Sequence, residues 1–390
     1  MPSSLATQWT LDPSITFLNH GSFGACPRVV QEAQSKLRAR LEAEPVRFMV
    51  RELEPLMDDV RRKLGALLGA DADDLVFVTN ATMGVNTVLK SQRFSAGDEL
   101  LTTDHAYNAC RNALDEVASV HDAKVTVATL PWPVRDEEGL VSAITSAMTP
   151  RTKLLLLDHV TSPSAIVLPV ERITREANAR GIEVLIDGAH APGMLPLNLT
   201  AIGASYYTGN CHKWLCAPKG AAFLWVRRDR QKSLRPLSIS HGRNSPRTDR
   251  SKFRIEFDWT GTSDPTAPLC ISAAIDFLES LGGLSEVMRQ NRDLALEGRD
   301  ILLKALGAEA MVPEALTGSM AVAPLPDATT HQLSNSDPLQ DALLFDHQIE
   351  VPVMPFPATP KRLLRLSAQR YNDASDYHRL ASALGLLLEQ

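Results

Sequence analysis

Between residues 70 and 230, short apolar runs alternate with amphipathic segments, and this alternation leaves few folds open to the chain. The run at 153–160 contains four consecutive leucines, which is typical of a strand buried on both faces. Further strands are predicted at 75–78, 99–103, 124–129, 182–186, 205–208 and 221–226, separated by helices at 81–90, 109–120 and 169–180. This order predicts an α/β fold with a mostly parallel central sheet and helices on both faces.

The flanking segments predict a second, smaller domain. Residues 1–27 read as an irregular arm, and 28–265 as the large α/β domain, whose helices at 29–44 and 47–68 could pack on the small domain. The stretch 231–260, rich in Arg, Ser and Pro, is predicted to be a long loop or hairpin. Residues 266–390 are predicted to form a smaller C-terminal α+β domain, with helices at 268–281, 284–306 and 377–388 and strands at 319–322 and 362–366.

Composition excludes several classes of partner. The 390 residues are 44% hydrophobic and 22% charged, with a net charge of −6, so nothing favours nucleic-acid binding. No apolar run approaches the roughly 20 residues that span a membrane, and the N-terminus lacks the features of a secretion signal. Five scattered cysteines without CxxC spacing favour reduced thiols in the cytoplasm and neither a disulfide framework nor a metal site.

An aspartate at a strand end and a lysine downstream give the first indication of chemistry. Asp187 directly follows the predicted strand 182–186, and parallel sheets bind ligands at the carboxyl ends of their strands. Lys213 lies in the weakly charged stretch 206–214, where the neutral, nucleophilic amine is favoured. Pyridoxal 5'-phosphate (PLP) needs this pair, because a carboxylate keeps its ring nitrogen protonated and a lysine binds its aldehyde. The sequence therefore predicts an enzyme that acts on amino acids.

The order of these and other motifs resembles the class V aminotransferase family of fold-type I PLP enzymes, and within it the isopenicillin N epimerase-like branch. The resemblance extends from Phe17-Leu18-Asn19-His20-Gly21 to Leu366-Ser367-Ala368-Gln369-Arg370-Tyr371-Asn372. It implies that Lys213 holds the cofactor aldehyde, that Asp187 pairs with the ring nitrogen, and that His190 lies near the ring edge or its phenolic oxygen.

The resemblance also implies how the rest of the cofactor is held. The phosphate would rest on the start of a helix at Asn80, Ala81 and Thr82, where backbone N–H groups and the helix dipole favour an anion, with His212 nearby. The ring would stack on His105 or Tyr107, two alternatives that the sequence leaves open. Hydrogen bonds to the phenolic oxygen would come from Thr161 and Ser162.

Substrate and subunit contacts are implied in the same way. Arg365 would bind the α-carboxylate in a bidentate contact, and Asn19 and His20 would line the same pocket. Thr262 would reach the phosphate of a neighbouring subunit, which implies a homodimer with shared active sites. Ser263 departs from this motif, since the family usually carries an arginine there.

The reaction itself is less constrained than the cofactor. The leading prediction is epimerisation of an amino acid or amino-acid-containing substrate through loss of the Cα proton. Its second acid, on the face opposite Lys213, would be one of Tyr107, His105, Ser240 and His241. The alternative is a carbon–sulfur β-lyase on a cysteine conjugate or sulfoxide, and a transaminase or a non-catalytic PLP-binding protein remain further alternatives. No GxGxxG follows a strand, which disfavours a nicotinamide enzyme, and no cysteine follows Cys270 that could carry a persulfide.

Overall fold

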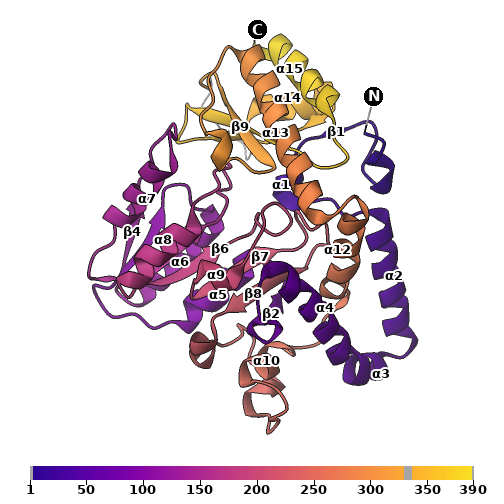
Figure 1. Ribbon diagram of the computed structural model, residues 1–390, viewed down its shortest axis with the longest axis vertical. Coiled ribbons are helices and arrows are strands. Elements are labelled where there is room, and N and C mark those ends of the chain that lie inside the picture. Colours follow the sequence, from indigo (N-terminus) through magenta and orange to yellow (C-terminus); the bar gives the residue numbers. More distant parts are fainter. Residues whose placement is uncertain (1–2, 329–335, 389–390) are drawn as a thin grey trace.

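The computed structural model describes residues 3–328 and 336–388, and its centre is a seven-stranded sheet (Figure 1). The strand order is β2-β8-β7-β6-β5-β3-β4, and only β8 runs antiparallel to its neighbours. The strands are β2 (Leu75–Val78), β3 (Glu99–Thr103), β4 (Lys124–Ala128), β5 (Thr152–Asp158), β6 (Glu183–Asp187), β7 (Tyr206–Asn210) and β8 (Ala222–Val226). The predicted mostly parallel sheet is therefore confirmed.

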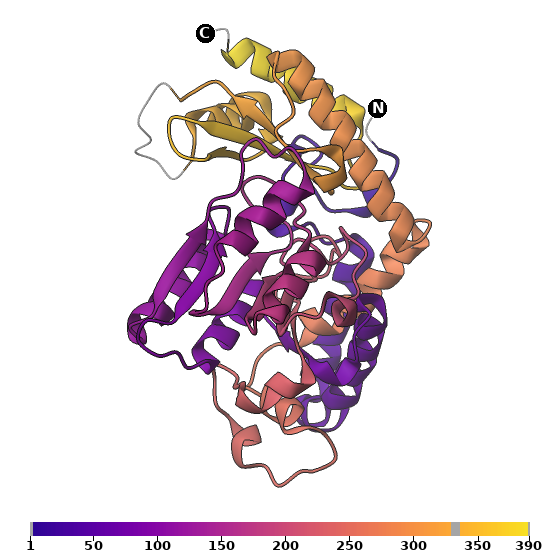
Figure 2. The same ribbon diagram turned by 60° about the vertical axis from the view of Figure 1, so that its left-hand side comes forward.

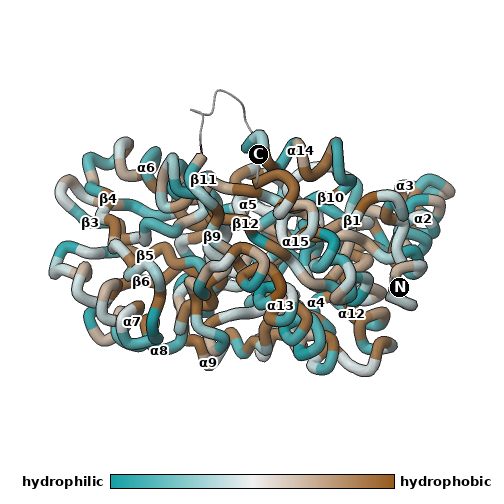
Figure 3. The backbone as a smooth tube through the Cα atoms, turned by 90° about the horizontal axis from the view of Figure 1, so that it is seen from above, coloured by the Kyte–Doolittle hydropathy of each residue, from teal (hydrophilic) through white to brown (hydrophobic). Residues whose placement is uncertain are grey.

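Both faces of this sheet are buried, which explains the leucine run in β5. Leu154 and Leu156 belong to one apolar cluster, whereas Leu155 and Leu157 belong to another on the opposite face. One face is covered by α5 (Ala81–Ser91) and α6 (Asn108–Val120), and the other by helices that include α7 (Glu137–Ser146), α8 (Val170–Ala179) and α9 (Leu199–Ile202). Figure 3 shows apolar, brown segments running through the middle of the molecule. The predicted helical layers on both faces are confirmed.

The small domain is built on a three-stranded antiparallel sheet in the order β11-β12-β9. Its long helix α13 extends from this sheet towards α12 and the large domain (Figures 1 and 2). The N-terminal arm joins it, because β1 pairs with β10 in parallel and Leu18 lies in the same apolar cluster. Its elements are β1 (Thr16–Phe17), α13 (Leu284–Leu306), β9 (Met320–Leu325), α14 (Pro338–His347), β10 (Ile349–Glu350), β11 (Val353–Pro355), β12 (Arg362–Ser367) and α15 (Ala374–Leu388).

The remaining helices are α1 (His20–Phe23), α2 (Arg28–Ala43), α3 (Pro45–Arg47), α4 (Leu53–Leu68), α11 (Thr266–Leu269) and α12 (Ile271–Ser280). Both α2 and α4 contact α11 and α12, which lie after the predicted domain boundary at residue 266. That boundary stays a prediction. Among the residues described, no single helix has the length and apolar content to cross a membrane, although the pair 266–280 and 284–306, bent by 71°, passes that test together.

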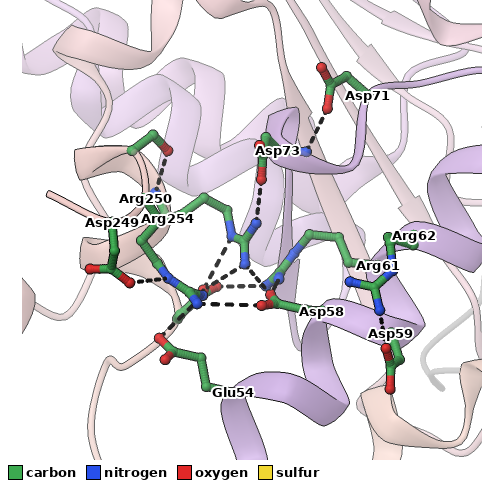
Figure 4. Close-up of polar contacts among 12 residues, drawn as sticks. Glu54, Asp58, Asp59, Arg61, Arg62, Asp71, Asp73, Asp249, Arg250 and Arg254 are labelled. Carbon is green, nitrogen blue, oxygen red and sulfur yellow. Dashed lines mark hydrogen bonds and ion pairs between the residues drawn. The ribbon is translucent and has the colours of Figure 1, made fainter.

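The stretch 231–260 contains a helix, α10 (Lys252–Phe257), where the sequence predicted a long loop or hairpin. Buried ion pairs to α4 explain the difference (Figure 4). Arg254 pairs with Asp58 of α4 and with Asp73, and Arg61 of α4 pairs with Asp58 and with Asp258 just after α10. The contacts made by Arg254 and Asp258 join residues 181 to 197 positions apart, so helical periodicity within the stretch could not predict them. They hold the chain that leads into the loop at 259–264.

Candidate active site

A cavity of about 350 Å³ opens at the carboxyl ends of the parallel strands. This is the place where α/β sheets bind ligands, and the volume suits a cofactor-sized molecule. Most of the residues predicted to hold PLP contribute to its wall. The lining consists of Ser22, Phe23, Thr79, Asn80, Ala81, Thr82, Tyr107, Asp158, Val160, Ser162, Asp187, Ala189, His190, Asn210, His212, Lys213, Lys219 and Gly220.

Lys213 projects into this cavity from the loop after β7. Its Nζ lies 3.3 Å from Nε2 of His190, and its backbone oxygen is 3.0 Å from Nε2 of the buried His20. Burial, followed by the positive charge of Arg365, lowers the pKa of Lys213 to about 7. A large share of the amine is therefore neutral near neutral pH, which is the form that attacks an aldehyde.

Asp187 is the last residue of β6, and 3% of its surface is exposed. Its Oδ1 accepts the backbone N–H of Ala189 at 3.0 Å, and its Oδ2 accepts the thiol of Cys110 at 3.0 Å. Burial raises the pKa of Asp187, while these two donors and the charge of Lys213 oppose the rise. The carboxyl group is thus held rigidly in the cavity wall, as a partner for a ring nitrogen must be.

His190 lies beside Lys213 as a neutral imidazole. Burial, followed by the charge of Lys213, lowers its pKa well below the usual value. Within the described residues, its buried Nδ1 has no hydrogen-bond partner. A buried ring nitrogen without a partner is costly, so this atom favours a ligand in the cavity.

The start of α5 provides a site for an anion on the cavity wall. Asn80 caps the helix by accepting the N–H of Met83 at 2.8 Å, and Asn210 accepts the N–H of Ala81 at 2.8 Å. The side chain of Thr82 lines the cavity beside them. The helix dipole adds positive potential, because α5 spans eleven residues.

Two residues with basic side chains line the same cavity. His212 lines the cavity, and its Nδ1 lies 3.1 Å from the backbone oxygen of Ala221, which leaves Nε2 for a ligand. Lys219 also lines the cavity and donates to the backbone oxygen of Gly24 at 2.8 Å. Lys219 contributes a positive charge that suits a phosphate, whereas burial lowers the pKa of His212 to about 4 and keeps its imidazole neutral, so the predicted contact of His212 with the phosphate stays a prediction.

The two candidates for the stacking ring occupy different positions. Tyr107 lines the cavity and is 44% exposed. His105 is buried behind the wall, where Nδ1 is 2.7 Å from Ser164 Oγ and the ring meets Trp132 and Phe356 edge-on. The structure therefore brings Tyr107 to the cavity and leaves His105 outside its lining.

Of the predicted pair Thr161 and Ser162, likewise, only one residue lines the cavity. Ser162 lines the cavity. Thr161 is fully buried in its own loop, where Oγ1 accepts the N–H of Ile166 at 2.8 Å and lies 2.7 Å from Ser164 Oγ. Only Ser162 is in place to contact a molecule in the cavity directly.

Arg365 lies just behind the wall and touches it through two serines. Its Nη1 donates to the backbone oxygen of Ser162 at 2.6 Å, and its Nη2 donates to Ser22 Oγ at 3.1 Å. The side chain is 3% exposed, and none of the ion pairs among the described residues involves it. Burial lowers its pKa to about 10, so it stays a cation at neutral pH. A buried cation without a carboxylate partner favours binding of an anionic substrate group.

Asn19 and His20 lie one layer behind the cavity. Asn19 donates to Glu350 and accepts from Ser22 Oγ, while His20 contacts Tyr371 and the backbone of Lys213. Neither side chain is part of the lining, so their predicted contact with substrate stays a prediction. Their observed contacts position Ser22 and Lys213.

Thr262 is exposed in the loop between α10 and α11, outside the cavity lining. Its neighbours Gly261 and Ser263 line a second cleft of about 240 Å³, which shares Thr79 and Gly220 with the cavity. The loop is thus close to the site but does not reach it within one subunit. Ser240 and His241, two of the suggested second acids, also lie outside the lining.

Sequence reasoning missed several residues of the site. Asp158, Cys110, Lys219, Ser22 and Asn210 all line the cavity or bond to residues that do. Asp158 and Asn210 had a detectable signal, because each ends a strand of the parallel sheet just as Asp187 does. Cys110 and Ser22 had none, since only long-range packing brings them to the site.

These residues fit PLP. The cavity has a reactive amine, a buried carboxylate and a positively polarised anion site on different parts of one wall, together with the unpartnered Nδ1 of His190. Lys213 would bind the aldehyde, Asp187 the ring nitrogen, and the start of α5 the phosphate. In the described part of the chain, no three His, Cys, Asp or Glu side chains gather as a group able to hold a metal ion.

Known proteins support the same assignment. The chain is 37% identical to the isopenicillin N epimerase of Amycolatopsis lactamdurans, over 97% of this chain and 98% of that protein. It is 29% identical to a probable chloroplastic L-cysteine desulfhydrase of Arabidopsis thaliana, over 97% of this chain and 84% of that protein. The solved structure of the cysteine desulfurase CsdA from Escherichia coli has the same fold, with a TM-score of 0.80 at 22% identity over 99% of this chain and 98% of that one. The family model described as aminotransferase class-V matches residues 15–379, and the chain belongs to that family.

Proposed function

We propose that this protein is an epimerase that removes and returns the Cα proton of an α-amino acid or amino-acid-containing substrate. That it is a PLP-dependent enzyme of the aminotransferase class V family follows from the family match together with the fit of the site. One observation carries the proposal: the Lys213 amine and the Asp187 carboxyl line a single cavity, and the Arg365 guanidinium, which has no carboxylate partner among the described residues, lies behind Ser22 and Ser162 of its wall. The similarity to an isopenicillin N epimerase over nearly the whole chain supports it.

Each residue has a defined task in this reaction. Arg365 binds the substrate carboxylate, and the two serines that it contacts keep its guanidinium facing the cavity. Lys213 Nζ accepts the Cα proton, which it can do near neutral pH because its pKa is about 7. PLP, when bound, supplies the electron sink for the Cα electrons, and the Asp187 carboxylate holds the proton on its ring nitrogen.

Epimerisation needs a second acid, and Tyr107 is the best placed of the four candidates. It lines the cavity, whereas His105, Ser240 and His241 do not. Burial raises the pKa of its phenol, so it carries a proton at neutral pH. We propose that Tyr107 Oη donates this proton to Cα from the face opposite Lys213.

A carbon–sulfur β-lyase is the second candidate. It requires the same Cα deprotonation but no acid on the opposite face. The similarity to a probable L-cysteine desulfhydrase over nearly the whole chain favours it. The two functions therefore differ in the fate of the substrate rather than in the residues that bind it.

Proton NMR of the PLP-loaded protein in D₂O separates these functions. The samples contain single enantiomers of amino acids, cysteine conjugates and sulfoxides. We expect the α-proton signal to disappear while the carbon skeleton stays intact and both enantiomers form. Release of a keto acid together with a thiol or sulfenate would replace the epimerase proposal with the lyase.

Arg365→Met is expected to raise the KM for an α-amino acid about 100-fold, because the substrate carboxylate loses its buried cationic partner. Arg362 provides a matched control on the same strand, since it pairs with Asp337 instead of contacting the site. Arg362→Met should leave KM within about threefold of wild type. Steady-state kinetics on both variants is the measurement, and an equal KM in the two would place the carboxylate elsewhere.

We also propose that the protein is a cytoplasmic homodimer in which Thr262 reaches the cavity of the other subunit. Thr262→Ala is then expected to weaken PLP binding roughly 10-fold, because a phosphate contact is lost. At a PLP concentration near the wild-type dissociation constant, mixed dimers of Lys213→Ala and Thr262→Ala subunits should contain one intact site in two, recover about half of the wild-type activity and exceed both parents. Light scattering that finds only active monomers, or mixed dimers no better than the parents, would contradict the shared site.

A further inference from the structure

Two carboxyl groups lie side by side in the cavity wall, and only one of them has been given a task. Asp158 and Asp187 are the last residues of the adjacent parallel strands β5 and β6, and they stand directly opposite each other in register. Their side chains therefore leave the sheet on the same face, from strands about 4.8 Å apart. Both line the cavity, and they are 5% and 3% exposed.

The surroundings of Asp187 stabilise a negative charge better than those of Asp158. Asp187 accepts hydrogen bonds from the Cys110 thiol and the Ala189 N–H, and the charge of Lys213 also lowers its pKa. The backbone N–H groups of Tyr107 and of Asp158 itself favour its charged form, but none of the ion pairs formed by the described residues includes Asp158. Burial and then the charge of Asp187 raise the pKa of Asp158 well above the ordinary value. Two adjacent buried carboxyl groups do not both ionise, so the proton belongs on Asp158.

We propose that Asp158 is a positioning residue that stays a neutral carboxylic acid beside Asp187, so that this end of the cavity presents one negative charge to the ring nitrogen of PLP. A single charge matches the single proton that the ring nitrogen carries, whereas a second would remain buried and unpaired. The same carboxyl group lines the cavity together with Tyr107, whose backbone N–H influences its pKa, so it is placed to position the loop that carries this tyrosine. The inference concerns the cofactor site and holds for an epimerase and a lyase alike.

Infrared spectroscopy tests the proton directly. We expect the difference spectrum between PLP-loaded wild type and Asp158→Asn at neutral pH to contain the carbonyl stretch of a protonated carboxyl group, and this band should shift in D₂O. Asp276→Asn, which removes an exposed carboxylate, should give only carboxylate bands. A carboxylate band in place of the carbonyl band for Asp158 would overturn the proposal.

Cofactor binding tests the positioning role without relying on turnover. Asp158→Asn keeps a neutral group with an oxygen acceptor, so we expect its PLP dissociation constant to stay within about threefold of wild type. Asp158→Ala removes the polar group beside Asp187 and the backbone of Tyr107 and should weaken PLP binding roughly 10-fold or more. Equal affinities in the two variants would refute the role, whichever reaction the enzyme catalyses.

The pH dependence of stability provides a third measurement. Because the pKa of Asp158 is raised in the folded protein, its contribution to stability is complete below the ordinary aspartate pKa of about 4 and is lost as the pH rises through the folded value. The melting temperature of Asp158→Asn minus that of wild type should therefore grow by about 2 °C or more from about pH 5 to about pH 8. Asp187, Cys110, Tyr207 and Lys213 face the pair and are present in both proteins, so their titrations largely cancel. A constant difference would show that Asp158 does not hold the proton.

Discussion

Lys213→Ala is expected to remove the yellow absorbance of the lysine-bound cofactor and to lower turnover by on the order of 10⁴-fold. Among the described residues, the variant loses the one lysine of the cavity lining besides Lys219, whose Nζ donates a hydrogen bond to the backbone oxygen of Gly24. It also loses the group that accepts the Cα proton. Ultraviolet–visible spectra of the PLP-loaded variant and NMR measurement of α-proton exchange check the two losses separately.

Two control measurements, one on Lys90→Ala and one on wild type, show whether the losses in Lys213→Ala are specific to that lysine. Lys90→Ala removes an exposed lysine at the end of α5 and should leave spectrum and exchange unchanged. In wild type, the rate of cofactor capture should rise with pH through about 7, because deprotonation of Lys213 produces the attacking amine. A yellow Lys213→Ala protein with normal exchange would show that another residue binds the aldehyde.

Asp187→Asn is expected to retain bound PLP but to lower α-proton exchange by on the order of 10³-fold. The amide has nearly the same shape and can still accept the N–H of Ala189, so the cavity should keep its form. It cannot carry the negative charge that holds a proton on the ring nitrogen, and the Cα electrons then lose most of their stabilisation. Cofactor content from absorbance and exchange from NMR are the paired measurements.

The combination of outcomes identifies the role of Asp187. Loss of cofactor together with exchange would indicate that the carboxylate mainly binds PLP. Retention of both would assign the ring nitrogen to another partner, and Asp158 is the only other carboxyl group in the cavity lining. The double variant Asp158→Asn, Asp187→Asn would then lose exchange even though the Asp187 variant did not.

The sequence predicted the central sheet well, because its signals are local. A strand covered on both faces requires a continuous apolar run. The four leucines at 154–157 form such a run within the single strand β5, so a short segment of the sequence is enough to recognise it. The prediction failed in the stretch 231–260, where α10 depends on ion pairs between Arg254 and residues of distant elements. No periodicity within the stretch itself carries that information.

The residues of the candidate site also fall into two groups, those that local sequence signals predict and those whose place depends on tertiary packing. Asp187 and Lys213 could be identified because a residue at a strand end is exposed to the ligand side of a parallel sheet whatever the details of packing. The choice between His105 and Tyr107 could not be made, because it depends on whether Ser164, Trp132 and Phe356 enclose the histidine ring. These residues are far from His105 in the sequence, and Phe356 reaches it only when the small domain packs on the large one.

The sequence alone therefore determined the α/β sheet, the strand-end aspartate, the lysine and the family, since each is expressed within a short segment. The tertiary structure decided which side chains share the cavity. It placed Arg365 against Ser22 and Ser162, and it set Asp158 directly beside Asp187. Both results depend on strand register and domain packing, which are properties of residues far apart in the chain and so are invisible to any local pattern.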